Sequence, residues 1–283
     1  MRLGVYEKAL PSDLSWSERL ALARRLGFDY LELSIDESEA RLARLDPGSP
    51  ERRAIRGAVA ETGVPVWSLC LSAHRRFAPG SASAATRARA HALFVGAIDL
   101  AVELGVRVIQ VAGYYVYYED ETPASKARYS EGVARGADLA ADAGVMLGIE
   151  NMDTVGIGSL EEGLELLAQI GSPWLQLYPD LGNLVERGCD PLRELDLARG
   201  RMVAVHAKDA RPGEPRRVPF GEGGVPFEAA LQALASAGYA GPMLVEMWND
   251  DAPDSVQRLG AARAWLADRL VAAGFVVREV LPA

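Results

Sequence analysis

The sequence predicts a (β/α)₈ barrel, an α/β fold in which eight parallel strands alternate with helices, as a single domain over residues 1–283. Short apolar runs rich in β-forming residues alternate with longer runs of helical period, which is the pattern of parallel strands joined by crossover helices. The polar loops YYEDETPAS, DARPGEPRR and MWNDDAPDS mostly follow the C-terminal ends of strands. In a barrel, that end carries the active site.

Eight strand–helix pairs can be assigned in order. The predicted strands cover residues 2–6, 30–34, 65–71, 107–112, 145–150, 174–180, 202–206 and 243–248. The predicted helices cover residues 15–26, 50–61, 84–104, 124–143, 159–170, 191–198, 227–237 and 255–272. Several helices are followed by a glycine that predicts their end: Gly27, Gly63, Gly105, Gly144, Gly171 and Gly238.

An open, doubly wound sheet would give the same alternation of strands and helices. Its usual mark is a glycine-rich turn after the first strand, and here that turn reads YEKALP. The closed barrel is therefore the favoured fold.

Composition excludes several classes of function. With 39 acidic and 30 basic residues the net charge is -9, which opposes nucleic-acid binding. Cys70 and Cys189 form no CxxC pair, so neither a disulfide framework nor a thiolate zinc site is expected. The first residues do not read as a signal peptide, and no apolar stretch reaches the ~18 residues that a membrane span needs. We therefore expect a cytoplasmic protein without membrane or nucleic-acid partners.

Four consecutive predicted strands carry a metal-binding type of residue at or near their C-terminal end: Glu150, Asp180, His206 and Glu246. Taken singly, each has an ordinary explanation, such as a helix cap at Asp180, an ion pair at Glu246 or a core histidine at His206. Four such ends on adjacent barrel strands would, however, surround one point. Three carboxylates and an imidazole suit one divalent ion, Mn²⁺, Zn²⁺, Co²⁺ or Mg²⁺, so we predict a metal site.

Several motifs carry a resemblance to a known family. GVYEKALP, SIDESEARLARLD, SLCLSAHRRF, IQVAGYYVYYE, YPDLGNL, VPFGEG and LVEMW resemble the L-ribulose-5-phosphate (L-xylulose-5-phosphate) 3-epimerases, which are xylose isomerase-like TIM barrels. The likeness runs over roughly residues 3–250. It implies an isomerase of carbohydrate metabolism that inverts C3 of a ketopentose phosphate through an enediolate. It also implies a homodimer or larger homo-oligomer.

The resemblance further implies roles for the four residues. Glu150 and Glu246 would be metal ligands that also carry protons on opposite faces of the substrate, whereas Asp180 and His206 would be ligands only. A carboxylate or carbonyl should hold the second imidazole nitrogen of His206. The sequence does not identify that partner.

Four further residues are candidates for binding the sugar or sugar phosphate. Asn183 follows Asp180 in the loop where related epimerases contact substrate, although an ordinary turn asparagine is equally compatible. Arg216 matches a substrate-contacting arginine of the family, but Arg217 is adjacent, so the sequence leaves open which of the two is the equivalent residue. Lys208 shares the strand parity of His206 and points either into the site or into a salt bridge. His74 follows an inward-facing strand.

The phosphate site is left open between two loops. The glycines of PFGEGG, at positions 221, 223 and 224, follow the seventh strand, where many barrels bind phosphate through backbone N–H groups. The basic segment Ser72–Arg76 follows the third strand, and its alternative is a solvated charge pair on the surface.

Other functions remain as alternatives. An abasic-site endonuclease of the same superfamily would need several zinc ions and many histidines, and the chain has only His74, His91 and His206. A non-catalytic sugar-binding barrel would not need both glutamates. Closer rivals are aldose–ketose isomerisation, epimerisation at C4 of a keto-acid, and epimerisation of an unphosphorylated ketose.

Overall fold

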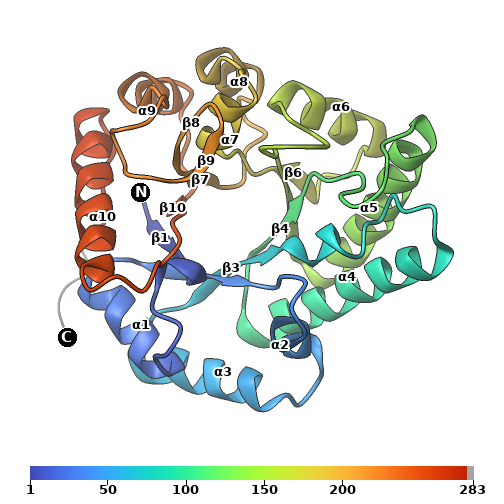
Figure 1. The fold of residues 1–283 in the computed structure, drawn as a ribbon, viewed down its shortest axis with the longest axis horizontal. Coiled ribbons are helices and arrows are strands. Elements are labelled where there is room, and N and C mark those ends of the chain that lie inside the picture. The colour runs from blue at the N-terminus through green and yellow to red at the C-terminus, as the bar shows by residue number, and fades with distance from the viewer. Residues whose placement is uncertain (279–283) are drawn as a thin grey trace.

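The computed structural model of the protein describes residues 1–278 and contains an eight-stranded parallel sheet. Around this sheet the strands follow the order β6-β5-β4-β3-β2-β1-β10-β7. Isolated parallel bridges join Leu177 to Met202 and Asp180 to His206, between the β6 and β7 edges. The sheet thus closes into the predicted barrel (Figure 1). Its strands are β1 Leu3–Tyr6, β2 Tyr30–Ser34, β3 Val66–Leu71, β4 Val108–Ala112, β5 Met146–Glu150, β6 Leu175–Leu177, β7 Val205–Ala207 and β10 Met243–Val245.

A ring of helices surrounds the strands (Figure 1). The helices are α1 Trp16–Arg25, α2 Glu39–Leu42, α3 Pro50–Thr62, α4 Ala84–Leu104, α5 Pro123–Ala143, α6 Leu160–Ile170, α7 Leu181–Glu186, α8 Pro191–Leu197, α9 Phe227–Ser236 and α10 Ser255–Ala272. Short 3-10 turns follow three strands or helices: η1 Glu7–Ala9, η2 Ala43–Leu45 and η3 Ser72–Arg75. The eight predicted helices are confirmed, and α2 and α7 are additional.

The loop DARPGEPRR has more structure than the sequence predicts. It forms an antiparallel hairpin of β8 Asp209–Arg211 and β9 Glu214–Val218. The hairpin follows β7 directly and so stands over the C-terminal end of the barrel.

Local sequence signals fix the helix ends. Ser15 caps α1 and Glu18 returns the bond to the Ser15 backbone, which satisfies amides that the helix leaves free. Gly63, Gly105 and Gly144 end α3, α4 and α5 with φ near +70°, in the left-handed region that glycine adopts without steric cost. Helix lengths are therefore set mainly by local chemistry.

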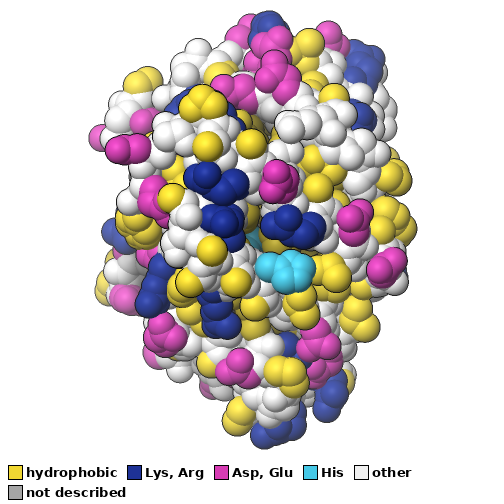
Figure 2. Space-filling view, turned by 90° about the vertical axis from the view of Figure 1, so that its right-hand side faces the viewer, with side chains coloured by type: hydrophobic (Ala, Val, Ile, Leu, Met, Phe, Trp, Pro, Cys, Tyr) yellow, Lys and Arg dark blue, Asp and Glu magenta, His cyan; other side chains and the backbone are white. Residues whose placement is uncertain are grey.

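The outer surface mixes charged and apolar side chains. Figure 2 shows one side of the barrel, where basic side chains gather near a histidine. His91, on α4, is exposed. The hollow that Arg87, His91 and Arg135 help to line has a volume of only about 10 Å³. It is at most large enough for one water molecule. Among the described residues, no helix is long and apolar enough to cross a membrane.

Candidate active site

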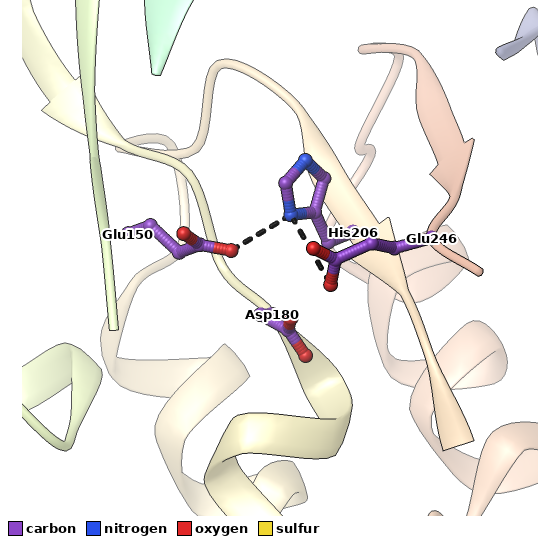
Figure 3. A group of neighbouring side chains, drawn as sticks. All are labelled: Glu150, Asp180, His206 and Glu246. Carbon is purple, nitrogen blue, oxygen red and sulfur yellow. Dashed lines mark hydrogen bonds and ion pairs between the residues drawn. The ribbon is translucent and has the colours of Figure 1, made fainter. Parts of the chain in front are cut away.

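The four strand-end residues meet at one point, as the sequence predicts (Figure 3). Glu150 is the last residue of β5, His206 lies within β7, Glu246 follows β10, and Asp180 begins α7 just after β6. One potential ligand atom from each lies within 4.8 Å of those of the other three, and all four residues are buried. Parallel strands place their carboxyl ends at the same edge, and this common edge brings the four side chains together.

His206 is held from both sides by carboxylates. Its Nδ1 lies 2.8 Å from Oε1 of Glu150 and 3.9 Å from Oε2 of Glu246. Its Nε2 lies 2.9 Å from Oε1 of Glu32, which comes from β2. The other oxygen of Glu32 accepts hydrogen bonds from Ser68 at 2.7 Å and Tyr178 at 2.8 Å. Glu32 is therefore the partner of the imidazole that the sequence could not identify.

Asp180 is fixed by its backbone and by one of its two carboxylate oxygens. Its N–H donates to Oδ1 of Asn151 at 2.8 Å, and its carbonyl accepts from Nδ2 of Asn151 at 3.0 Å. Oδ1 of Asp180 accepts from the backbone N–H of Asn183 at 2.9 Å, which caps α7. The second oxygen, Oδ2, is left directed at the cluster.

Lys208 places a positive charge beside this cluster. Its Nζ lies 2.9 Å from Oδ2 of Asp180, 3.3 Å from Oε2 of Glu246 and 2.6 Å from Oδ1 of Asn183. The predicted position of Lys208 in the site and the predicted salt bridge are thus both present.

Burial and crowding of charge perturb the acid–base properties of the site. Burial raises the pKa of Glu150, against the opposing effect of His206. Burial likewise raises the pKa of Asp180 to about 7, although Lys208 opposes the shift. Burial disfavours the His206 imidazolium, but Glu32 and Glu150 outweigh this effect and raise the pKa of His206 well above 6.5. The pocket therefore concentrates negative charge that a cation would neutralise.

The donor set fits a divalent metal ion. Asp180 Oδ2 and Glu246 Oε2 are buried and, within residues 1–278, accept no well-formed hydrogen bond. Both oxygens share the ammonium of Lys208, at 2.9 and 3.3 Å, and a metal ion or a proton would satisfy them further. Oxygen and nitrogen ligands lie roughly 2.0–2.2 Å from a divalent transition metal, so two ligands of one ion are at most about 4.4 Å apart. The observed limit of 4.8 Å requires only a small contraction of the cluster.

A cavity of about 160 Å³ opens onto the cluster. It is lined by Glu150 and Glu246, by three of the predicted substrate contacts, Asn183, Lys208 and Arg216, and by further polar residues that include Lys8, Ser72, Arg75, Tyr114 and Asp153. A neighbouring cavity of about 210 Å³ shares Lys208, Glu246 and Trp248, but Phe220, Trp265 and other apolar side chains form much of its wall. The smaller cavity has the chemistry for a polyhydroxylated substrate.

Arg216 reaches the smaller cavity from β9. Its Nη2 lies 3.2 Å from Oδ2 of Asp153, and its guanidinium lies 5.6 Å from the centre of the Trp248 ring. Arg217, the other candidate for the substrate-contacting arginine, lines the neighbouring cavity instead, and its backbone φ is 65°.

His74 lies outside the cavity, and the expected substrate contact does not fit its position. The side chain is fully buried, with Nε2 3.2 Å from the carbonyl oxygen of Ala90 and its ring centre 4.5 Å from that of Phe94. Burial lowers the pKa of His74 to about 4. The next residue, Arg75, lines the cavity instead.

Three polar residues of the site were missed because they occupy the middle of apolar strands. Glu32 lies in YLELS, Ser68 in VWSLCL and Gln110 in VIQVA, and all three are fully buried. Nε2 of Gln110 donates to Oε2 of Glu150. A charged or amide side chain inside an otherwise apolar barrel strand is the signal that could have identified them.

Comparison with known proteins agrees with this site. The model of the xylose isomerase-like TIM barrel family matches residues 20–269. L-Ribulose-5-phosphate 3-epimerase UlaE of Salmonella paratyphi B is 46% identical over 274 residues, which cover 97% of this chain and 96% of the relative.

Two solved structures share the fold. An L-ribulose 3-epimerase is 22% identical with a TM-score of 0.82, covering 96% of this chain and 95% of its own. The D-allulose 3-epimerase from Methylomonas sp., in complex with D-allulose, is 22% identical with a TM-score of 0.79, covering 95% of this chain and 97% of its own. The chain belongs to the xylose isomerase-like TIM barrels and, among them, to the L-ribulose-5-phosphate 3-epimerase family, which confirms the predicted enzyme class, an isomerase.

Proposed function

We propose that the chain epimerises a ketopentose phosphate at C3, interconverting L-ribulose 5-phosphate and L-xylulose 5-phosphate, with one divalent metal ion per chain. The observation that carries the proposal is the convergence of Glu150 and Glu246 on one nitrogen of His206, at 2.8 and 3.9 Å. The 46% identity to an L-ribulose-5-phosphate 3-epimerase supports the choice of substrate.

Glu150, Asp180, His206 and Glu246 would hold the metal ion. When bound, Mn²⁺, Zn²⁺, Co²⁺ or Mg²⁺ would polarise the ketose carbonyl and stabilise negative charge that develops on its oxygen. Nδ1 of His206 is the nitrogen available to bind the metal ion, because Nε2 faces Glu32.

Inversion at C3 requires a proton carrier on each face of the carbon. Glu150 and Glu246 approach the centre of the site from opposite sides (Figure 3), since β6 and β7 lie between their strands. One glutamate begins as the carboxylate and takes the proton when the C3–H bond breaks. The other begins as the carboxylic acid and protonates the opposite face, so each turnover exchanges their protonation states.

Neighbouring side chains position the two carriers. Gln110 donates to Glu150, and Lys208 forms an ion pair with Glu246 at 3.3 Å. Apart from this ion pair, Oε2 of Glu246 accepts no hydrogen bond from the described part of the chain, which supports its role as the oxygen that takes up a proton. Asn183, Arg216 and Lys208 line the cavity and would orient the substrate hydroxyl groups.

Solvent-proton exchange tests the proposal. The metal-loaded protein is incubated in D₂O with phosphorylated and free pentuloses, and the products are followed by NMR. We expect deuterium at C3 together with inversion, fastest with a ketopentose phosphate. Deuterium at C1 would indicate aldose–ketose isomerisation, and equal rates with the free sugar would indicate an unphosphorylated substrate. No exchange with any ketose would overturn the enzymatic proposal.

Two expectations from the sequence stay predictions: assembly as a homodimer or larger homo-oligomer, and a cytoplasmic location.

A further inference from the structure

We propose that Lys208 competes with the divalent metal ion for Asp180 and Glu246, and thereby sets how tightly the site holds its metal. The inference rests on the metal-binding part of the proposed function and adds a role for a residue that is not itself a metal ligand. Lys208 directly follows β7 and is two residues from His206. Its side chain is buried, with 5% of its surface exposed.

The contacts of Lys208 fall on oxygens that a metal ion would need. Its Nζ lies 2.9 Å from Oδ2 of Asp180 and 3.3 Å from Oε2 of Glu246. Oδ1 of Asp180 is already engaged, because it accepts from the backbone N–H of Asn183 at the start of α7. Oδ2 is thus the oxygen that Asp180 would offer to a metal ion, and Lys208 shares it.

Two cations that share one oxygen lie close together. A divalent transition metal binds a carboxylate oxygen at roughly 2.0–2.2 Å. An ion on Oδ2 of Asp180 would therefore lie at most about 5 Å from Nζ of Lys208. Because both charges would be buried, water and salt would screen their repulsion much less than at the surface. The ammonium group therefore opposes binding of the ion.

Lys208 is the one lysine or arginine of the described part of the chain that forms ion pairs with the ligand carboxylates. Other basic side chains of the same cavity have partners elsewhere. Lys8 pairs with Asp36 at 2.7 Å, and Arg216 pairs with Asp153 at 3.2 Å. Without Lys208, a metal ion would therefore bind a more negative site and would bind it more tightly.

The surroundings of Lys208 keep its ammonium group at the site. Gly182 leaves room for the side chain, because a Cβ atom there would come within 3.0 Å of Cε of Lys208. Oδ1 of Asn183 accepts from Nζ at 2.6 Å, and Nδ2 of Asn183 donates to the carbonyl oxygen of Asn151 at 2.8 Å, which fixes the orientation of the amide. Asn183 would remain a partner when a metal ion takes Asp180, so the ammonium group can turn towards the cavity.

The opposite role for Lys208 predicts the opposite change in metal affinity. A lysine that only orients Asp180 and Glu246 would leave a weaker metal site when it is removed. A lysine that competes with the ion would leave a tighter one. The sign of the change therefore decides between the two roles.

The test compares metal binding by Lys208→Met and Lys8→Met with that of the wild type. Mn²⁺ is added to metal-free protein, without substrate, in competition with a chromogenic chelator. We expect Lys208→Met to lower the dissociation constant for Mn²⁺ at least about tenfold, because a tenfold change needs only part of the repulsion between two buried charges. Lys8→Met removes the same charge from the same cavity, but Lys8 pairs with Asp36 rather than with a ligand residue. Its dissociation constant should stay close to that of the wild type.

Two further measurements guard against a damaged variant. Lys208→Gln removes the charge but keeps a polar side chain, and it should also bind Mn²⁺ more tightly than the wild type. If Lys208→Met does not fold, Lys208→Gln carries the comparison. In thermal unfolding, one fixed concentration of Mn²⁺ should raise the melting temperature of the Lys208 variants by more than that of the wild type. Damage to the site would weaken binding, so it cannot imitate this result.

The binding assay contains no sugar and so separates this inference from the proposed function. Tighter Mn²⁺ binding by the Lys208 variants supports the inference even if no ketose exchanges its C3 proton, a result that would overturn the proposed epimerisation alone. Unchanged or weaker binding by a folded Lys208 variant would overturn the competition. An equal gain in Lys8→Met would also overturn it, because the effect would then come from the net charge of the cavity. Absence of Mn²⁺ binding by every form would overturn both the inference and the proposed metal site.

Discussion

Nε2 of His206 lies 2.9 Å from Oε1 of Glu32, a carboxylate that reaches across the barrel interior from β2. A metal-bound His206 would be neutral and carry one N–H, and a bond from Nε2–H to Glu32 would leave the lone pair of Nδ1 directed at the cluster. Ser68 and Tyr178 both donate to the second oxygen of Glu32. We therefore infer that Glu32 is a positioning residue, which would select the tautomer of His206 that a metal ion requires.

Glu32→Gln is expected to weaken metal binding by about 10- to 100-fold, the usual effect of removing an outer-shell partner. Ser68, Tyr178 and His206 contact both carboxylate oxygens of Glu32, but a glutamine has only one acceptor oxygen. Its NH₂ group would therefore face at least one of these donors. Competition with a chromogenic chelator measures the affinity. Glu39→Gln, at an exposed position on α2, is the control and should behave like the wild type. An unchanged affinity in Glu32→Gln would show that Glu32 does not orient the imidazole.

Removal of divalent metal should inactivate the protein and lower its stability. We expect about one ion per chain, and at 100 times the dissociation constant the ion should add about 2.7 kcal/mol to the free energy of unfolding. Elemental analysis and thermal unfolding with added metal measure both quantities. His206→Ala should lose affinity first and recover part of its activity at high metal concentration. Several ions per chain would instead revive the endonuclease alternative.

His74 should make the folded state less stable in mild acid. Its pKa is lowered to about 4 by burial, whereas an unfolded histidine titrates near ~6.5. Between these values the unfolded chain binds one more proton, so stability falls as the pH falls through this window, by about 3 kcal/mol in all. Above the window both states are neutral, and below it both are protonated, so the pH dependence from His74 vanishes outside it.

Urea unfolding at pH 7.5 and pH 5 measures this effect. His74→Gln can still donate to Ala90 but cannot titrate, so it should lose about 2 kcal/mol less than the wild type between the two pH values. His91→Gln, at the exposed histidine, should follow the wild type. Parallel losses in the wild type and His74→Gln would contradict a buried, neutral His74.

The barrel and its cluster of potential metal ligands could be predicted from the sequence because both follow from periodic patterns. Glu150, Asp180, His206 and Glu246 each end an apolar run, and parallel strands bring such ends together whatever the loops do. The strand bounds were less accurate. The predicted strand 174–180 is reduced to Leu175–Leu177, because Asp180 serves as the N-cap of α7.

The contacts that depend on side-chain direction could not be predicted. Glu32 and Gln110 face the barrel interior, but a strand pattern alone does not show which of two faces carries a polar residue to the site. His74 and Arg75 show the same limit, because a 3-10 turn after β3 buries the first and turns the second into the cavity. The hairpin of β8 and β9 depends on long-range packing over the barrel mouth.

The central claim is that Glu150 and Glu246 each serve one face of C3. The most direct test is the exchange of the C3 proton in D₂O by Glu150→Gln and Glu246→Gln, starting separately from each of the two epimers. Both variants should fold, and both should lose at least about 100-fold in epimerisation, the lower range for a proton-transfer residue. Each should still exchange the proton of one epimer without inversion, and the two variants should retain opposite epimers. Near-normal epimerisation by either variant, or exchange of both epimers by one variant, would contradict the two-glutamate mechanism.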